Sequence, residues 1–138
     1  MNKIVICPGS FDPVTRGHVE IIKRAAKMFD HVIVAVLVNS AKKPCFSTDE
    51  RLDMLRLALG NIHNVEIASF EGLLANYCKE RKADAVIRGL RAVTDFEYEF
   101  QMALTNKKLN PNLETIFLTA DSDSMYLSSS MVREVASM

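Results

Sequence analysis

The sequence predicts an α/β fold in which a doubly wound, Rossmann-like parallel sheet of five strands carries helices on both faces. Five short apolar runs rich in β-branched residues recur along the 138 residues, and segments with helical spacing separate them. A repeated order of strand, helix and strand requires right-handed crossovers, and therefore a parallel sheet covered by helices on both sides. The length is that of one domain, which we expect to span residues 1–138.

The strands are expected where an apolar run is short and rich enough in Val and Ile to be buried on both faces of a sheet. These runs are Lys3–Cys7, Val32–Val38, Val65–Ser69, Ala83–Arg88 and Glu114–Leu118.

The helices are expected where apolar residues recur three or four positions apart. In chain order, these residues are Val19, Ile22, Ala26 and Phe29; Leu52, Leu55 and Leu59; Leu74, Tyr77 and Cys78; and Phe96, Phe100, Ala103 and Leu104. Ser47 with Glu50, and Thr94 with Glu97, have the spacing of capping boxes at the starts of the second and fourth helices. Gly60 suits the end of the second helix.

Charge, hydropathy and cysteine content exclude several classes of protein. Seventeen Lys and Arg residues balance seventeen Asp and Glu residues, so we expect no nucleic-acid partner. The longest apolar run, Val32–Val38, is too short to span a bilayer, and the N-terminus leads directly into a strand; we expect no membrane partner and a cytoplasmic location. Cys7, Cys45 and Cys78 are widely spaced, which favours reduced packing thiols over a metal or redox site.

The loop after the first strand, Pro8–His18, is the first candidate site, because ligands of doubly wound sheets bind beyond the carboxyl ends of the strands. Gly9 and Gly17 let the backbone approach a ligand, Ser10 offers a hydroxyl group, and the start of the next helix offers free N–H groups to a phosphate. The alternative is a Gly- and Pro-rich turn with an incidental histidine.

The end of this loop, Thr15-x-Gly17-His18 after Gly-Ser-Phe-Asp-Pro, resembles the T/H-x-G-H signature of the nucleotidylyltransferase superfamily. That resemblance implies that His18 stabilises the charge that develops on the α-phosphate of a nucleotide during transfer. The implied role suits phosphoryl-type transfer, which relies on positioning and electrostatic stabilisation.

A second candidate segment ends the fourth expected strand, where Arg88 and Arg91 flank Gly89 and Leu90. Arginine forms forked hydrogen bonds with phosphate, although two solvated surface arginines are the alternative. The stretch R-G-L-R-x-x-x-D-F-E-Y-E over residues 88–99 is similar to the diagnostic stretch of the phosphopantetheine adenylyltransferase family.

Two further segments match the same family. Ser128–Arg133 alone predicts a serine cap that opens a last helix, and it resembles the family's S-S-S-x-V-[RK] element, which binds the triphosphate. Lys42 alone would be an ordinary solvated lysine, but the run from Lys42 to Phe46 matches the family pattern K-K-P-x-F.

The resemblance runs in one register from Lys3 to about Ala136 and implies a single nucleotidylyltransferase domain over residues 1–138. It implies transfer of the adenylyl group of ATP to 4′-phosphopantetheine, which yields dephospho-coenzyme A and pyrophosphate without a covalent intermediate. It also implies Mg²⁺ held mainly by substrate oxygens, with no protein metal ligand, and a homo-oligomer that is a hexamer.

The resemblance assigns the site residues as well. The catalytic residues are His18, Lys42 and Arg91. The phosphopantetheine ligands are Ser10, Lys42, Leu74 and Arg88. The ATP ligands are Ser10, Phe11, His18, Gly89, Leu90, Arg91, Glu99, Ser124, Met125, Tyr126, Leu127, Ser128, Ser129 and Ser130.

Two alternatives remain open from the sequence. One is an enzyme of the same superfamily with another acceptor or nucleotide, such as a cytidylyltransferase or a nicotinamide mononucleotide adenylyltransferase; the R-G-L-R stretch argues against both. The other is a nucleotide-binding regulatory module of the same fold without turnover, which fold alone does not exclude.

Overall fold

A computed structural model describes residues 2–39, 41, 43–91 and 93–119. In chain order, its elements are β1 (Ile4–Gly9), α1 (Arg16–Met28), β2 (His31–Leu37), α2 (Thr48–Leu59), β3 (Val65–Phe70), α3 (Leu74–Glu80), β4 (Ala85–Leu90), α4 (Val93–Leu109) and β5 (Glu114–Thr119). All five predicted strands are confirmed, with ends that differ from the prediction by no more than two residues.

The strands form one sheet in the order β3-β2-β1-β4-β5, and every neighbouring pair is parallel. The chain therefore winds outward from β1 to one edge, returns beside β1 as β4, and ends at the other edge. This reversal places the switch point between β1 and β4. In doubly wound sheets, the crevice at the carboxyl ends of those two strands is where ligands bind.

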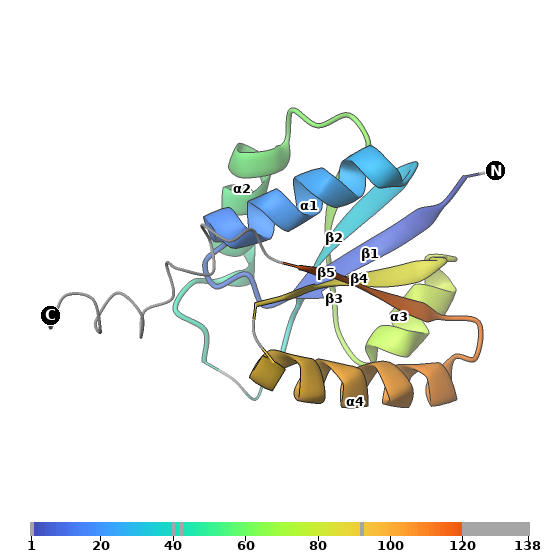
Figure 1. Ribbon diagram of the computed structural model, residues 1–138. Coiled ribbons are helices and arrows are strands. Elements are labelled where there is room, and N and C mark those ends of the chain that lie inside the picture. Colours follow the sequence, from blue (N-terminus) through green and yellow to red (C-terminus); the bar gives the residue numbers. More distant parts are fainter. Residues whose placement is uncertain (1, 40, 42, 92, 120–138) are drawn as a thin grey trace, which may run out of the picture.

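Alternate residues of each strand face opposite layers of helices (Figure 1). One layer is α1 and α2, whose buried residues Ile22, Ala25, Leu55 and Leu59 pack on strand residues such as Val34. The other layer includes α3, from which Tyr77 and Cys78 pack on Ile6, Ile33 and Val86. The prediction of a doubly wound sheet with helices on both faces is confirmed.

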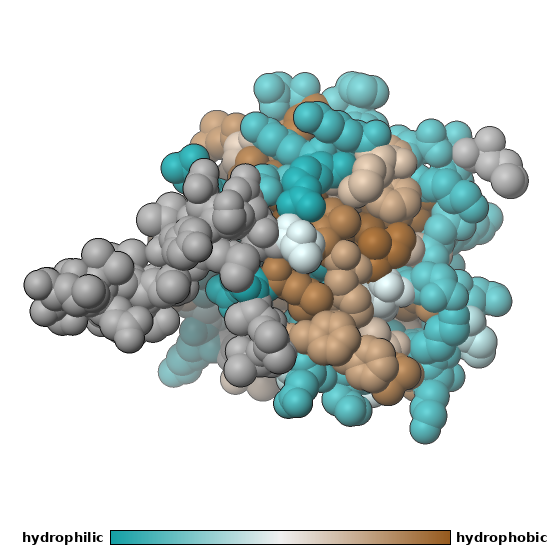
Figure 2. All heavy atoms as spheres, viewed as in Figure 1, coloured by the Kyte–Doolittle hydropathy of each residue, from teal (hydrophilic) through white to brown (hydrophobic). Residues whose placement is uncertain are grey.

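The fourth helix differs from the prediction in its exposure and in its start. Its expected inward residues remain partly exposed, with Phe96 at 43%, Phe100 at 44% and Leu104 at 47%. The space-filling view shows apolar side chains reaching the surface over β5 and α4 (Figure 2). Thr94 is not the cap residue, because α4 already begins at Val93. By contrast, the predicted capping box of Ser47 and Glu50 is present at the start of α2.

No helix in the described part of the chain is long and apolar enough to cross a membrane.

Candidate active site

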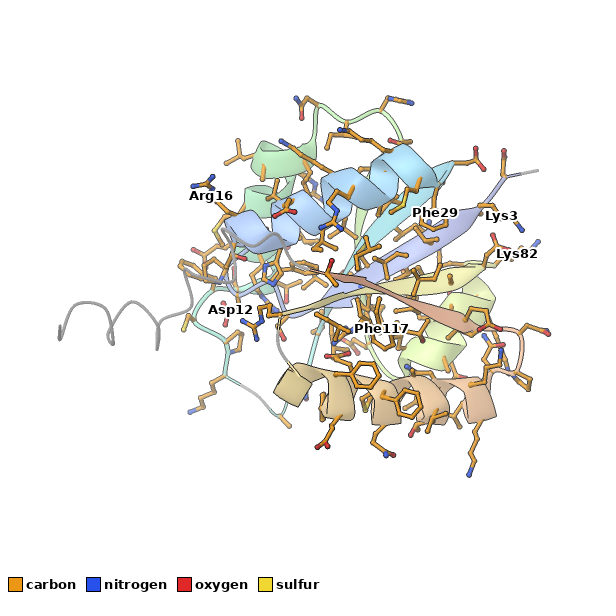
Figure 3. The ribbon with its side chains drawn as sticks, viewed as in Figure 1. Lys3, Asp12, Arg16, Phe29, Lys82 and Phe117 are labelled. Atoms are coloured by element: carbon orange, nitrogen blue, oxygen red, sulfur yellow. The ribbon has the colours of Figure 1, made fainter. Side chains whose placement is uncertain are left out.

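The carboxyl end of the sheet gathers the predicted site residues that the structure describes. Ser10 and Phe11 follow β1, His18 lies in the first turn of α1, Leu74 opens α3, Arg88 to Arg91 end β4, and Glu99 lies on α4. Figure 3 marks this end by Asp12 and Arg16, and the opposite end by Lys3, Phe29 and Lys82. Lys42 and the segment 124–130, which includes the predicted serine cap, lie outside the described residues.

His18 is fixed by a capping box in which a histidine takes the place of the usual Glu or Gln. The backbone N–H of Thr15 donates to Nδ1 of His18 over 3.0 Å. In return, the Thr15 hydroxyl oxygen accepts from the backbone N–H of His18 over 3.3 Å. Because Nδ1 accepts a hydrogen bond, the proton of the neutral ring is on Nε2. His18 thus offers an N–H donor on the side of the ring that faces away from Thr15.

The surroundings of His18 favour this neutral form. Its ring lies edge-on to Phe11, with the ring centroids 5.0 Å apart. The loss of water around the inner part of the ring lowers the pKa of His18 below its ordinary value of 6.5, and the positive charge of Arg91 lowers it further. That electrostatic effect also identifies Arg91 as a neighbour of His18, so the structure brings these two predicted catalytic residues together.

Phe11 supports the site from beneath. Its backbone has a φ of +47°, an uncommon conformation for a residue with a side chain. This conformation turns the ring into the core, where it is 5% exposed. A Cβ at Gly9 would lie 3.2 Å from the Phe11 ring, so glycine permits this close packing. The buried Phe11 ring therefore helps to orient His18.

Arg88 and Glu99, predicted to bind different substrates, bind each other. Nε and Nη2 of Arg88 each donate to one oxygen of Glu99 over 2.8 Å, a forked ion pair. Nη1 of Arg88 donates to the carbonyl oxygen of Pro8 over 3.3 Å. Glu99 therefore holds one edge of the guanidinium group and turns the other edge toward the end of β1.

The residues that follow Arg88 bring the end of β4 close to α1. A Cβ at Gly89 would lie 3.2 Å from Cγ1 of Ile21, so a larger residue would crowd the side chain of Ile21 on α1. Leu90 ends the strand half-buried, and Arg91 is exposed. The glycine between the two arginines thus permits close packing of β4 on α1.

Leu74 lies farther along the same end of the sheet. It is half-buried and packs on the core beneath α3. Beside it in sequence, Glu71 and Gly72 line a hollow of about 350 Å³ together with residues at the end of β2. This hollow lies at the carboxyl ends of β2 and β3.

Two residues of this region have no role in the sequence prediction. The carboxylate of Asp12 accepts the backbone N–H groups of Cys45 (2.8 Å) and Phe46 (2.9 Å). Arg51 is 4% exposed, although it lies on a helix that carries mostly surface charges. Its position four residues before Leu55 and eight before Leu59, on the buried side of α2, was the signal in the sequence that it would be buried.

The two buried cysteines, Cys7 and Cys78, are not suited to covalent catalysis. Burial raises the pKa of Cys7 to about 12, although the nearby charge of Arg88 acts in the opposite direction. Burial also raises the pKa of Cys78 to about 11. Because the thiolate is the nucleophilic form, both thiols are inert at neutral pH.

The sheet order and the residues gathered at the carboxyl ends of β1 and β4 are those expected of a nucleotidyltransferase. The chain matches the cytidylyltransferase-like family over residues 6–135. It is 58% identical over 134 residues to the phosphopantetheine adenylyltransferase of Caldanaerobacter subterraneus subsp. tengcongensis. That alignment covers 97% of this chain and 84% of the relative. It is also 60% identical over 131 residues to the phosphopantetheine adenylyltransferase of Dictyoglomus turgidum, in an alignment that covers 95% of this chain and 82% of the relative. The chain belongs to the phosphopantetheine adenylyltransferase family.

A more distant solved structure shares the fold. A bifunctional NMN adenylyltransferase/ADP ribose pyrophosphatase from Francisella tularensis superposes with a TM-score of 0.63 at 20% identity, over 88% of this chain and 38% of that chain. At this identity the likeness shows the fold alone.

Proposed function

We propose that this enzyme transfers the adenylyl group of ATP to 4′-phosphopantetheine, which yields dephospho-coenzyme A and pyrophosphate. An oxygen of the acceptor phosphate attacks the α-phosphorus of ATP, and the bond from that phosphorus to the oxygen bridging to the β-phosphate breaks. The electron pair of the broken bond leaves with pyrophosphate. The acceptor oxygen is already ionised, so the protein needs no covalent nucleophile, in keeping with the inert Cys7 and Cys78.

The observation that carries this proposal is the convergence of His18, Arg88 and Arg91 on the carboxyl ends of β1 and β4. His18 acts as a neutral donor through Nε2 to an α-phosphate oxygen, where charge develops in the transition state. Arg91, beside His18, neutralises charge on the leaving pyrophosphate, and Arg88 binds the acceptor phosphate. Lys42 completes the set of catalytic cations, and residues 124–130 bind the nucleotide; both assignments rest on the sequence motifs.

We propose Mg²⁺ as the counterion of the ATP phosphates, bound mainly by substrate oxygens. The carboxylates of Asp12 and Glu99 are the acidic groups described next to this site, and both already accept two hydrogen bonds from protein donors. Among the described residues, no three His, Cys, Asp or Glu side chains form a group able to hold a metal ion. In this proposal the ion enters with the nucleotide and, when bound, would offset phosphate charge.

We also propose that the enzyme assembles as a homo-oligomer, a hexamer by family resemblance. Among the described residues, six of the nine large apolar side chains that remain exposed lie on α4. In a symmetric assembly, another copy of the chain would cover the exposed apolar face of α4 in every subunit. Because ATP is made and used in the cytoplasm, we propose that compartment as the location of the enzyme.

The proposal is tested by pyrophosphate release from ATP and Mg²⁺, with 4′-phosphopantetheine or nicotinamide mononucleotide as the acceptor. We expect release only with 4′-phosphopantetheine, loss of release when EDTA removes Mg²⁺, and a fall in kcat of about 100-fold or more in His18→Ala. ATP binding, measured by calorimetry, should persist in this variant.

His63→Ala is the matched control, since His63 is an exposed histidine in the connection between α2 and β3. Its kcat should equal that of the wild type. Release with nicotinamide mononucleotide, or ATP binding without release for any acceptor, would overturn the assignment in favour of another adenylyltransferase or a regulatory module.

A further inference from the structure

We propose that Asp12 and Arg51 are positioning residues, which together lock the β1–α1 loop onto the start of α2 and so fix the backbone of Ser10 at the transfer site. The inference rests on the proposed function, because Ser10 matters as the predicted ligand of both substrates. Neither residue touches the reacting atoms in this scheme; each acts through the backbone that it holds.

The first half of the lock is the carboxylate of Asp12. Its two oxygens separately accept the N–H groups of Cys45 and Phe46, over 2.8 and 2.9 Å. Two consecutive backbone N–H groups form a small anion-binding concavity, and hydrogen bonds to an ionised carboxylate are stronger than neutral ones. The contact therefore joins residues that are 33 and 34 positions apart in the sequence.

The second half is the guanidinium group of Arg51. Whereas Asp12 reaches from the β1–α1 loop toward α2, the Arg51 side chain reaches from α2 to that loop. Nη1 donates to the carbonyl oxygen of Ser10 over 2.9 Å. Nε and Nη2 donate to Ser47 and Thr48 at the start of α2, over 3.4 and 3.2 Å. Since all three acceptors are neutral oxygens, the buried charge is solvated by them, and losing one is costly.

The two contacts brace each other. Asp12 lies two residues after Ser10, and Cys45 and Phe46 directly precede the cap residue Ser47. Movement of either segment would therefore break both the carboxylate and the guanidinium contacts. The lock restricts Ser10, which directly follows β1, and the segment that contains Cys45 and Phe46. A displacement of about 1 Å in such a site costs up to about 100-fold in rate.

The test is Asp12→Asn, which keeps the size of the side chain but turns an amide NH₂ toward one of the two N–H groups, so that one contact is lost. We expect kcat for adenylyl transfer to fall by about 10-fold or more, while the KM for ATP stays within about twofold. The control is Glu50→Gln, which weakens the cap of α2 through Ser47 without touching Asp12. It should keep the wild-type kcat.

Arg51→Lys tests whether the two halves act as one unit. Lysine keeps the charge but cannot reach all three acceptors, so we expect Arg51→Lys to lower kcat. If the two contacts act as one unit, the double variant with Asp12→Asn should lose no more kcat than the more impaired single variant. Additive losses, a wild-type kcat in Asp12→Asn, or an equal loss in Glu50→Gln would each overturn the proposal.

Amide hydrogen exchange on the wild type tests the lock without relying on a variant that folds. The amides of Cys45 and Phe46 precede a helix in an exposed segment, yet we expect them to exchange much more slowly than the neighbouring amide of Lys43. Equal exchange would show that the lock does not form. A wild type without adenylyl transfer would instead refute the proposed function, and the exchange experiment would still report on the lock.

Discussion

At the residue scale, the hydrogen bond between Thr15 and His18 couples the protonation of His18 to the stability of the fold. Loss of water around the ring and the positive charge of Arg91 lower the pKa of His18 in the folded protein. A proton on Nδ1 would also face the N–H group of Thr15, so folding disfavours the charged ring. The unfolded chain then binds more protons than the folded chain between the lowered pKa and 6.5. Stability therefore decreases as the pH falls below 6.5 and stops changing below the folded pKa.

The measurement is the free energy of unfolding in urea between pH 4 and pH 8, for the wild type and for His18→Gln. Glutamine does not titrate and retains an oxygen that can accept from Thr15, as in an ordinary capping box. We expect the difference between the two proteins to be constant above pH 6.5 and to shift against the wild type below it. A shift in the opposite direction would mean that the ring prefers its charged form in the folded protein.

Single residues of the site were predictable to different degrees. His18, Arg88 and Arg91 stand in motifs at strand ends, and the structure brings them to one end of the sheet as expected. The roles of Asp12 and Arg51 were missed, because the contacts of Asp12 and the contact of Arg51 with Ser10 join residues 33 or more positions apart through backbone atoms, which leave no pattern in the sequence. The mutual pairing of Arg88 and Glu99 was missed for a similar reason, since spacing alone does not reveal how a side chain turns.

At the element scale, Asn64 joins α1 to the sheet at the end opposite the site. Its amide group donates to the carbonyl oxygens of Ala26 (2.8 Å) and Phe29 (3.1 Å), where α1 ends and its last carbonyl groups lack helical partners. Asn64→Ala removes both bonds and should lower the free energy of unfolding by about 1–2 kcal/mol. The corresponding fall in Tm is roughly 3–8 °C.

The control for this prediction is Asn61→Ala, because Asn61 is an exposed asparagine of the same connection. Its Tm should match that of the wild type. Both variants should keep the wild-type kcat, since the contact lies at the amino end of the strands. A loss of activity in Asn64→Ala at a temperature where it remains folded would contradict this separation of the two ends.

The strands were predictable because a strand buried on both faces needs a continuous apolar run, and the sequence shows five such runs. The layers of α1, α2 and α3 followed from the same apolar spacing. The fourth helix was not fully predictable, because an apolar face that packs on the sheet and one that stays partly exposed have the same periodicity. Only the exposure of Phe96 and Phe100 in the folded chain distinguishes the two.

At the scale of the whole molecule, the exposed apolar side chains are concentrated on one side. Phe96, Tyr98 and Phe100 line a surface hollow of about 480 Å³ on α4, and Phe96 also contacts Phe117 of β5. Tyr98 is 65% exposed, whereas a monomeric protein usually scatters its exposed apolar residues singly. With a formal net charge of zero, little long-range repulsion opposes the association of identical chains.

Tyr98→Asp should therefore shift the protein to a smaller species, because a carboxylate buried between two chains would lose its water without gaining a partner. The measurement is the molar mass by light scattering during size-exclusion chromatography, with circular dichroism to confirm the fold. Leu57→Asp is the matched control: Leu57 is 88% exposed, but it lies on α2 on the other face of the sheet, and its replacement should leave the mass unchanged. If both variants keep the wild-type mass, α4 does not form the interface between copies. If both dissociate, charge rather than the α4 face governs the assembly.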